Sequence, residues 1–261
     1  MPTSRVILKT RIDGTSYEMA CQQILDWICT SQASYVVAAN VHVVMTAYWQ
    51  PTYQQVINEA NLVTPDGMPL VWGLRLLGLH QQDRVYGPDL MLALCRQAAQ
   101  QNIPIYLYGG TDKTLEKLQD YLRQLLPGLD ITGAYSPPFR PLTFAEEAKD
   151  IERIRQAGAK LIFVGLGCPK QEIWMARHYR QLTAVMIGVG AAFNFHSGEV
   201  AQAPRWLMPL GLEWAYRLIR EPRRLWRRYL FNNPIFVILF VLQLVHHLLS
   251  QMLAGSNPPR A

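Results

Sequence analysis

The sequence predicts an α/β protein with a Rossmann-like, mainly parallel sheet flanked by helices, followed by a small helical C-terminal appendage. Short apolar, β-branched segments alternate with helical patterns along the first 200 residues, which is typical of a parallel sheet. Near residue 200 the pattern changes to aromatic, Arg-rich sequence punctuated by prolines. We therefore expect an α/β core over residues 1–200 and a basic, aromatic-rich helical appendage over residues 201–261.

Seven segments have the composition of buried strands. They are residues 6–8, 35–39, 62–64, 103–108, 131–134, 161–164 and 185–187. Helical patterns lie between them, for example at residues 16–30, 89–101, 111–126 and 143–157. Charges of both signs on the helix predicted at 111–126 indicate a solvent-exposed face.

The net charge of +6 comes entirely from the predicted appendage. Residues 1–200 contain 17 Lys and Arg against 17 Asp and Glu, whereas residues 201–261 contain eight Arg and two Glu. A basic tail attracts the phosphate groups of lipids, nucleotides or nucleic acids. The four cysteines form no metal-binding or redox spacing, which indicates free thiols in a reducing compartment. The N-terminus lacks a signal-peptide pattern, so we expect the globular part in the cytoplasm.

Prolines divide the appendage into three predicted helices at residues 209–220, 222–231 and 235–254. The last is apolar, and its 20 residues would reach roughly 30 Å, about the hydrocarbon thickness of a bilayer. Its second half carries polar side chains on one side, which a simple spanning helix rarely does. We therefore expect a peripheral helix on an anionic membrane surface, anchored by tryptophans and arginines. A packing helix of a soluble homo-oligomer is the alternative.

Three glycine-bearing turns follow predicted strands: Gly109-Gly110, Gly165-Leu166-Gly167 and Gly188-Val189-Gly190. Ligands of an open parallel sheet bind beyond the carboxyl ends of the strands, where glycines let backbone N–H groups approach a phosphate. The turns therefore predict a nucleotide diphosphate site, although glycine also serves helix–sheet packing. Neither a dinucleotide fingerprint nor a P-loop is present, which disfavours an NAD enzyme or a P-loop ATPase.

Three polar residues have two interpretations each, and two of them, Asp66 and Asn40, follow predicted strands. Asp66, in Thr64-Pro65-Asp66-Gly67, is either part of a turn or a general base at the sheet edge. Asn40 is either a helix N-cap or a ligand-binding group. Arg84 is either a surface ion pair or a phosphate clamp.

A series of longer motifs makes a family resemblance specific. In order, they are Asp66-Gly67-Met68-Pro69, Arg84-Val85-x-Gly87-x-Asp89, Gly165-Leu166-Gly167-Cys168-Pro169-Lys170-Gln171-Glu172, Gly188-Val189-Gly190-Ala191-x-Phe193, Ala203-Pro204-Arg205-Trp206, Gly211-Leu212-Glu213-Trp214-x-Tyr216-Arg217-Leu218 and Glu221-Pro222-Arg223-Arg224. Together they resemble the WecG/TagA/CpsF family, glycosyltransferase family 26, from about residue 35 to residue 230.

The resemblance implies an inverting, metal-independent glycosyltransferase of cell-surface polysaccharide biosynthesis that needs no cofactor. It implies transfer of an N-acetylmannosamine-type sugar from a UDP donor to an undecaprenyl-diphosphate-linked sugar. The family's proposed base falls on Asp66. Its other proposed site residues fall on Asn40, Arg84 and Gln171, and the arginines of its membrane-targeting appendage fall on Arg217, Arg224 and Arg227. Ala38 stands where the family often has Thr, which bears on the identity of the donor.

The charges fit a reaction without a metal. The sequence has no Asp-x-Asp motif, so arginines and helix N-termini are expected to stabilise the leaving diphosphate. We assign Arg217, Arg224 and Arg227 to the diphosphate and Arg223 and Arg228 to anionic lipid. Nucleic acid is not an expected partner, because an apolar helix follows the basic segment.

Two residues that could be reactive have simpler interpretations. Cys168 has no histidine nearby in sequence, so we interpret it as a small buried residue. His196 is interpreted as a structural histidine rather than a phosphate or sugar contact.

Two other functional hypotheses stay open from the sequence. One is an oxidoreductase or epimerase that modifies nucleotide sugars at an atypical Rossmann site. The other is a non-catalytic membrane adaptor whose α/β body only binds a nucleotide sugar.

Overall fold

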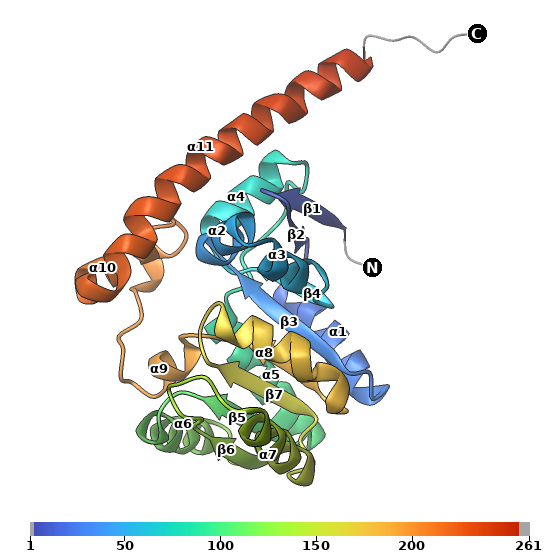
Figure 1. Cartoon of the computed structure of the whole chain (residues 1–261), viewed down its shortest axis with the longest axis vertical. Helices are drawn as coiled ribbons and strands as arrows, with labels where there is room; N and C mark the ends of the chain where they lie inside the picture. The colour runs from blue at the N-terminus through green and yellow to red at the C-terminus, as the bar shows by residue number, and fades with distance from the viewer. Residues whose placement is uncertain (1–2, 256–261) are drawn as a thin grey trace.

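The computed structural model describes residues 3–255 and has a six-stranded sheet at its centre (Figure 1). The strand order is β4-β3-β8-β7-β5-β6, and each neighbouring pair is parallel. The strands are β3 (Ser34–Ala39), β4 (Leu62–Pro65), β5 (Ile105–Gly109), β6 (Ile131–Tyr135), β7 (Leu161–Gly165) and β8 (Val185–Gly188). This arrangement confirms the predicted α/β fold with a parallel sheet.

Helices cover both faces of the sheet and bury one apolar cluster on each. The first face is covered by α2 (Val41–Trp49), α3 (Pro51–Asn58), α7 (Phe144–Gln156) and α8 (Lys170–His178). The second is covered by α1 (Tyr17–Cys29), α5 (Gly87–Gln101), α6 (Asp112–Leu125) and α9 (Ala192–His196). Because α2 follows β3 on one face and α9 follows β8 on the other, these neighbouring strands form a topological switch point, where a crevice opens.

A small hairpin at the N-terminus lies outside the main sheet. Its strands β1 (Ser4–Ile7) and β2 (Thr10–Asp13) pair only with each other, in antiparallel register. The sequence predicted a single strand at residues 6–8, and it missed β2, whose short segment carries polar residues on both sides of Ile12. Asp13 ties the hairpin to the edge of the sheet, because its carboxylate accepts the Val63 N–H at 2.8 Å.

The C-terminal helices differ from the prediction, because residues 209–212 precede the helix expected to begin there and the expected break at Pro234 is absent. α10 (Glu213–Arg220) is short, but α11 (Pro222–Gly255) is one continuous helix of 34 residues with Pro234 inside it. The predicted break at Pro234 was therefore wrong. Proline removes one helical hydrogen bond at a cost of about 3 kcal/mol, which tertiary packing on both sides can offset. The division of the chain near residue 200 stays a prediction.

Packing of α11 against the core supplies this compensation. Phe236 and Phe240 stack at a centroid distance of 5.9 Å and are buried in the cluster that contains α2 and α4 (Met68–Leu76). One turn further on, the Gln243 side chain accepts the Leu8 N–H at 2.9 Å and donates to the Val6 carbonyl at 2.6 Å. Gln243, in the polar second half of this helix, therefore contacts the N-terminal hairpin.

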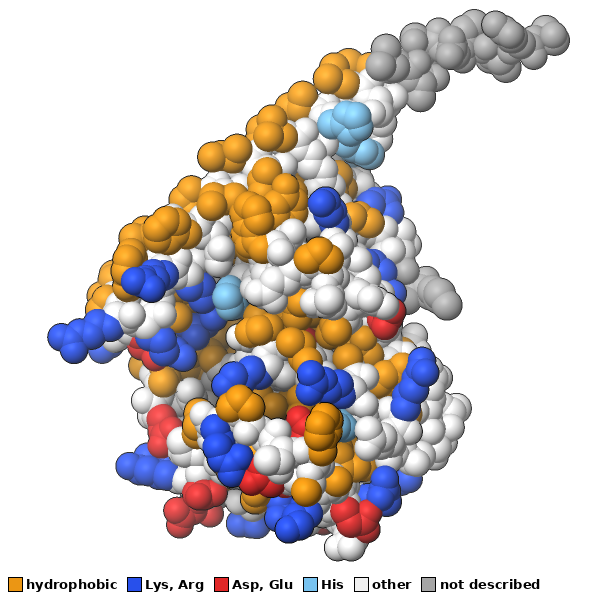
Figure 2. Space-filling model, viewed as in Figure 1, with side chains coloured by type: hydrophobic (Ala, Val, Ile, Leu, Met, Phe, Trp, Pro, Cys, Tyr) orange, Lys and Arg blue, Asp and Glu red, His pale blue; other side chains and the backbone are white. Residues whose placement is uncertain are grey.

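The other side of α11 is apolar and open to solvent. Figure 2 shows hydrophobic side chains along its outer edge. The exposed residues are Leu230, Phe231, Val237, Ile238, Val241, Leu242, Val245, Leu248, Leu249 and Met252. By length and composition alone, the segment Pro222–Met252 is also sufficient to cross a membrane.

Candidate active site

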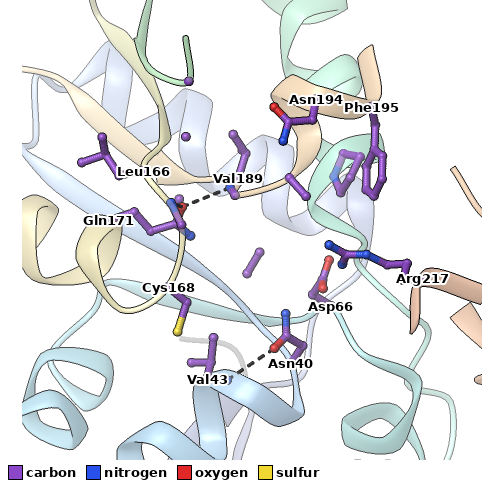
Figure 3. A pocket seen from close by; sticks show the side chains of 18 of the residues that line it. Asn40, Val43, Asp66, Leu166, Cys168, Gln171, Val189, Asn194, Phe195 and Arg217 are labelled. Atoms are coloured by element: carbon purple, nitrogen blue, oxygen red, sulfur yellow. Dashed lines mark hydrogen bonds between the residues drawn. The ribbon is translucent and has the colours of Figure 1, made fainter. Parts of the chain in front are cut away.

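Two cavities meet at the carboxyl ends of the strands. A polar cleft of about 360 Å³ lies over the crevice between β3 and β8 (Figure 3). A second, mainly apolar cavity of about 680 Å³ lies between α4, the segment around residue 210, and the first half of α11. Five residues line both cavities: Asn40, Asp66, Glu213, Arg217 and Arg228.

Asp66 lies at this junction, directly after the edge strand β4. Its backbone N–H donates to the Ala39 carbonyl at 2.8 Å, and its carboxylate accepts the Gly87 N–H at 2.6 Å. Burial raises the pKa of the Asp66 carboxyl, and the Arg84 guanidinium opposes this rise. A fixed carboxylate with a raised pKa in a cleft has the properties of a general base.

Arg84 is already paired inside the protein. One of its terminal nitrogens contacts the Glu213 carboxylate at 2.7 Å, and its Nε donates to the Asp66 carbonyl. Its guanidinium also lies 4.0 Å from the Tyr86 ring centroid, and the Tyr86 hydroxyl donates to Glu213 at 3.1 Å. Arg84 thus forms an ion pair, but the pair is largely buried and not on the surface as the sequence suggested, and the phosphate-clamp interpretation stays a prediction. It fastens the start of α10 to the backbone of Asp66.

The structure confirms the N-cap interpretation of Asn40, and its role in ligand binding stays a prediction. It is the N-cap of α2, because its Oδ1 accepts the N–H groups of His42 at 3.0 Å and Val43 at 3.3 Å. Asn40 also lines both cavities. Ala38, at the family's Thr position, also lines the polar cleft.

Gln171 joins two of the glycine turns. Its Oε1 accepts the N–H groups of Gly167 and Gly190, each at 3.1 Å. Its Nε2 donates at 2.7 Å to Glu172, a residue with no exposed surface. Burial raises the pKa of the Glu172 carboxyl. Gln171 lines the cleft, and its side chain fixes the floor between β7 and β8 (Figure 3).

One glycine in each of the three turns, namely Gly109, Gly165 and Gly188, permits close packing. A Cβ at Gly109 would lie 2.6 Å from the Gly165 backbone, and one at Gly165 would lie 2.6 Å from the Phe193 ring. A Cβ at Gly188 would collide with Met175. The Gly110 N–H donates to the Gly165 carbonyl, and the Gly167 and Gly190 N–H groups donate to Gln171. Close packing therefore explains Gly109, Gly165 and Gly188, and the N–H groups of Gly110, Gly167 and Gly190 already have partners inside the protein. A role of these turns in phosphate binding stays a prediction.

Three appendage arginines line the polar cleft: Arg217, Arg224 and Arg228. Arg224 pairs with Glu221 at 2.6 Å. Within residues 3–255, neither Arg217 nor Arg228 has a carboxylate at ion-pair distance, and the buried Nε of each has no hydrogen-bond partner. Burial disfavours the charged form of Arg228 and lowers its pKa, with Arg217 adding repulsion. An anion between these side chains would relieve both effects.

Arg227 lines neither cavity, and its guanidinium lies 5.2 Å from the centroid of the Trp226 ring. The structure therefore places Arg228 in the cleft and Arg227 outside it. The sequence had assigned Arg227 to the diphosphate and Arg228 to anionic lipid, so the two residues have the opposite locations. The reason is helical geometry, because residues 224 and 228 are one turn apart on α11 and residue 227 is rotated away from 228 by about 100°. The i, i+4 spacing was the signal that could have identified Arg228.

The sequence also missed the far end of the polar cleft, which is formed by residues with ordinary local roles. Thr111 caps α6, and the Thr114 hydroxyl donates to Glu199 at 2.7 Å. Phe139 is largely exposed in the loop after β6, and Asn194 lies on α9 (Figure 3). Only the Thr111 cap was recognisable as a pattern, since the others come together through the fold.

The interpretation of His196 agrees with the structure, whereas Cys168 is partly exposed and lines the polar cleft rather than being buried. Its partial burial raises the pKa of the Cys168 thiol to about 12, so it is protonated at neutral pH. His196 stacks on Tyr121 and contacts the Pro88 carbonyl at 3.0 Å, as expected of a structural histidine. Residues 3–255 contain no group of three or more His, Cys, Asp or Glu side chains placed to hold a metal ion.

Comparison with known proteins decides the family. The chain matches the profile of the glycosyl transferase WecG/TagA/CpsF family over residues 5–249. The chain belongs to the WecG/TagA/CpsF family. It is 31% identical over 202 residues to the N-acetylglucosaminyldiphosphoundecaprenol N-acetyl-beta-D-mannosaminyltransferase of Bacillus spizizenii, covering 77% of this chain and 76% of that protein. This WecG/TagA/CpsF protein is therefore a glycosyltransferase, and the family membership favours the first of the three functional hypotheses.

Proposed function

We propose that this glycosyltransferase moves an N-acetylmannosamine-type sugar from a UDP donor onto a sugar linked to a polyprenyl diphosphate. The observation that carries the proposal is the position of Asp66 at the junction of a polar cleft and an apolar cavity. A donor in one cavity and an acceptor entering from the other would meet at this carboxylate. The relative from Bacillus spizizenii is named for the same kind of transfer.

The polar cleft suits a nucleotide diphosphate sugar. Arg217 and Arg228 lie near Asp66 and supply positive charge for a diphosphate. The other end of the cleft offers an exposed aromatic ring, Phe139, and the Glu199 carboxylate. An aromatic ring can stack on a nucleobase, and a carboxylate can accept hydrogen bonds from ribose hydroxyls. We therefore place the sugar of the donor towards Asp66 and its nucleoside towards Phe139.

The proposed chemistry is a single displacement with inversion. The acceptor hydroxyl attacks the anomeric carbon, and its proton moves to the Asp66 carboxylate as the new C–O bond forms. The bond between the anomeric carbon and the diphosphate breaks, and UDP leaves with the electron pair. Charge on the leaving group is stabilised by Arg217 and Arg228, so we expect no requirement for a divalent metal.

We place the enzyme at the cytoplasmic face of the cell membrane as a peripheral protein. The exposed apolar side of α11 and the arginines at its start suit an anionic bilayer surface (Figure 2). This location would bring the active site close to a lipid-linked acceptor.

The experiment that tests the function is an assay of UDP release in EDTA. Wild type and Asp66→Asn are compared over a panel of UDP-sugars with a synthetic polyprenyl-diphosphate-linked GlcNAc acceptor. We expect acceptor-dependent release with a UDP-N-acetylmannosamine donor, and its collapse in the variant. Activity only after addition of Mg²⁺ would overturn metal independence, and no turnover with any donor would overturn the acceptor class.

A further inference from the structure

Glu213 lies where the C-terminal helices meet the core beside Asp66. It is the first residue of α10, and its side chain is only 14% exposed although it lines both cavities. One carboxylate oxygen, Oε2, contacts the Arg84 Nη2 at 2.7 Å, and the other, Oε1, accepts the Tyr86 hydroxyl at 3.1 Å. Both oxygens of this carboxylate are thus fixed by residues of the core.

Arg84 connects Glu213 to Asp66. Its Nε donates to the Asp66 carbonyl while its Nη2 contacts Glu213, and its side chain is 15% exposed. Charges that are buried to this extent are screened less by solvent and salt than surface charges are. Because Glu213 and Arg84 have opposite charges, their effects on the Asp66 carboxylate oppose each other.

We propose that Glu213 is a positioning residue for the transfer, because it holds Arg84 against the Asp66 backbone and neutralises the guanidinium charge. The Asp66 carboxylate thereby stays a stronger base than it would be beside an unpaired arginine. The inference rests on the proposed function, in which Asp66 takes the proton of the acceptor hydroxyl. It gives α10 a role in the proton transfer in addition to the arginine that this helix places in the cleft.

The charges around Asp66 support this role. Glu213 raises the pKa of the Asp66 carboxyl, as burial does, whereas Arg84 lowers it. The other titratable or charged groups nearby come from the surrounding helices: Tyr17 on α1, His42 on α2, Arg217 on α10 and Arg228 on α11 (Figure 3).

These other groups do not compete with Glu213 for the effect. Burial raises the pKa of Tyr17 to about 12 and lowers that of His42 to about 3, so both are neutral where a carboxyl with a raised pKa titrates. The charges of Arg217 and Arg228 are not altered by a change at Glu213. A shift in the titration of Asp66 after such a change therefore reports the charge of Glu213 and its pairing with Arg84.

The variant Glu213→Gln tests the proposal, because it keeps the shape of the side chain and an acceptor oxygen but removes the charge. The pKa of Asp66 should fall by about 1, since a negative charge is lost and Arg84 is no longer neutralised. The acid limb of kcat/KM against pH should move to lower pH by the same amount. The plateau of kcat should decrease by less than about tenfold, because the base is weaker. An unchanged acid limb would overturn the proposal, and a raised KM for the donor beside it would show that Glu213 binds substrate instead.

Three further variants separate charge from packing. Tyr86→Phe removes a hydrogen bond to Glu213 but no charge, so it should move the acid limb less than Glu213→Gln does. Glu221→Gln removes another carboxylate of the C-terminal region, which pairs with Arg224 at 2.6 Å, and should leave the limb in place. The double variant Arg84→Met/Glu213→Gln loses both opposing charges, and its limb should lie between those of the two single variants. A shift in either single control as large as that of Glu213→Gln, or a double variant outside this interval, would overturn the proposal.

A titration without substrate separates this inference from the proposed function. The Asp66 carboxyl is followed by NMR of the full chain, isotopically labelled at the aspartate carboxyl carbons, with Asp66→Asn identifying its resonance. We expect its pKa to fall by about 1 in Glu213→Gln. This fall without turnover of any donor would leave the effect of Glu213 on Asp66 standing and overturn the proposed function. Turnover in which neither the resonance nor the acid limb moves would overturn the role of Glu213 while the transferase function stood.

Discussion

The Gln171 Nε2 donates to the buried carboxyl of Glu172 at 2.7 Å. This hydrogen bond orients the Gln171 side chain so that its Oε1 faces two backbone N–H groups. That oxygen accepts from Gly167 and Gly190, so a single amide ties together the turns after β7 and β8. Glu172 also borders the cleft, but its side chain has no exposed surface, and its Oε1 accepts from the Gln171 amide. We interpret it as a positioning residue for the floor of the active site.

Replacement of Glu172 should therefore affect both stability and turnover. Glu172→Ala leaves the Gln171 Nε2 without its acceptor in a buried site, which costs about 1–3 kcal/mol before any cavity is counted. We expect a lower free energy of unfolding and a lower kcat with a smaller change in KM. Denaturant unfolding and steady-state kinetics measure these effects. Glu172→Gln, which keeps an acceptor oxygen, should restore most of the kcat, and equal loss in both variants would contradict the positioning role.

The pH dependence of the reaction should report Asp66. Burial raises the pKa of this carboxyl above its usual value of about 4, and only its deprotonated form accepts a proton. Activity should therefore be present above the Asp66 pKa and fall as the pH decreases through it. A profile of kcat/KM against pH measures the midpoint of this acid limb. Asp66→Asn should lower kcat by roughly 10²–10⁴-fold, the usual contribution of a general base, and a variant with an unchanged acid limb would exclude Asp66 as its source.

Removal of the charge of Arg84 should move the acid limb in a defined direction. The Arg84 guanidinium favours the charged form of Asp66, so its loss raises the pKa of that carboxyl further. The negative charge of Glu213, left without its Arg84 partner, would also raise the pKa of Asp66. Arg84→Met is therefore expected to shift the limb of the kcat/KM profile to higher pH, while Arg84→Lys should shift it less. A shift to lower pH would show that Arg84 does not act on Asp66 electrostatically.

Adjacent arginines of α11 should have unequal effects on donor binding. Arg228 lines the cleft and Arg227 does not. A charge-assisted hydrogen bond contributes about 1.5–3 kcal/mol, so Arg228→Gln should lower kcat/KM for the donor by roughly 10–150-fold. Arg227→Gln should change it by less than threefold in detergent solution, where membrane binding is not limiting. A larger loss in Arg227→Gln than in Arg228→Gln would support the assignment of Arg227 to the diphosphate that the family resemblance implied.

The attachment of α11 to the core should depend on two aromatic side chains. Phe240 is buried against α4, where its ring would lie 3.2 Å from a Cβ on Gly73. Phe240→Ala is expected to destabilise this packing by about 3–5 kcal/mol, as other Phe to Ala changes in protein cores do. Limited proteolysis of α11 and thermal unfolding measure the effect. Val241→Ala, at an exposed neighbouring position, serves as the control and should leave the proteolysis rate of α11 unchanged.

The sequence by itself determined the sheet, because each strand is a local apolar segment whose period differs from that of the helices beside it. It also indicated Asp66 and Asn40 as candidates, since parallel strands bring their carboxyl ends to one edge. It could not decide between the two interpretations of either residue. That choice depends on neighbours such as Gly87, 21 positions away, whose N–H fixes the Asp66 carboxylate.

Only the tertiary structure decided how the C-terminal region meets the core. The local signal of Pro234 indicated a break, but Phe236 and Phe240 are buried on the core, and α11 continues through the proline. That packing fixes the rotation of the helix, which turns Arg228 into the cleft and Arg227 away from it. It also closes the apolar cavity against α4. Contacts between segments more than 100 residues apart determine these features, and no local pattern in the sequence encodes them.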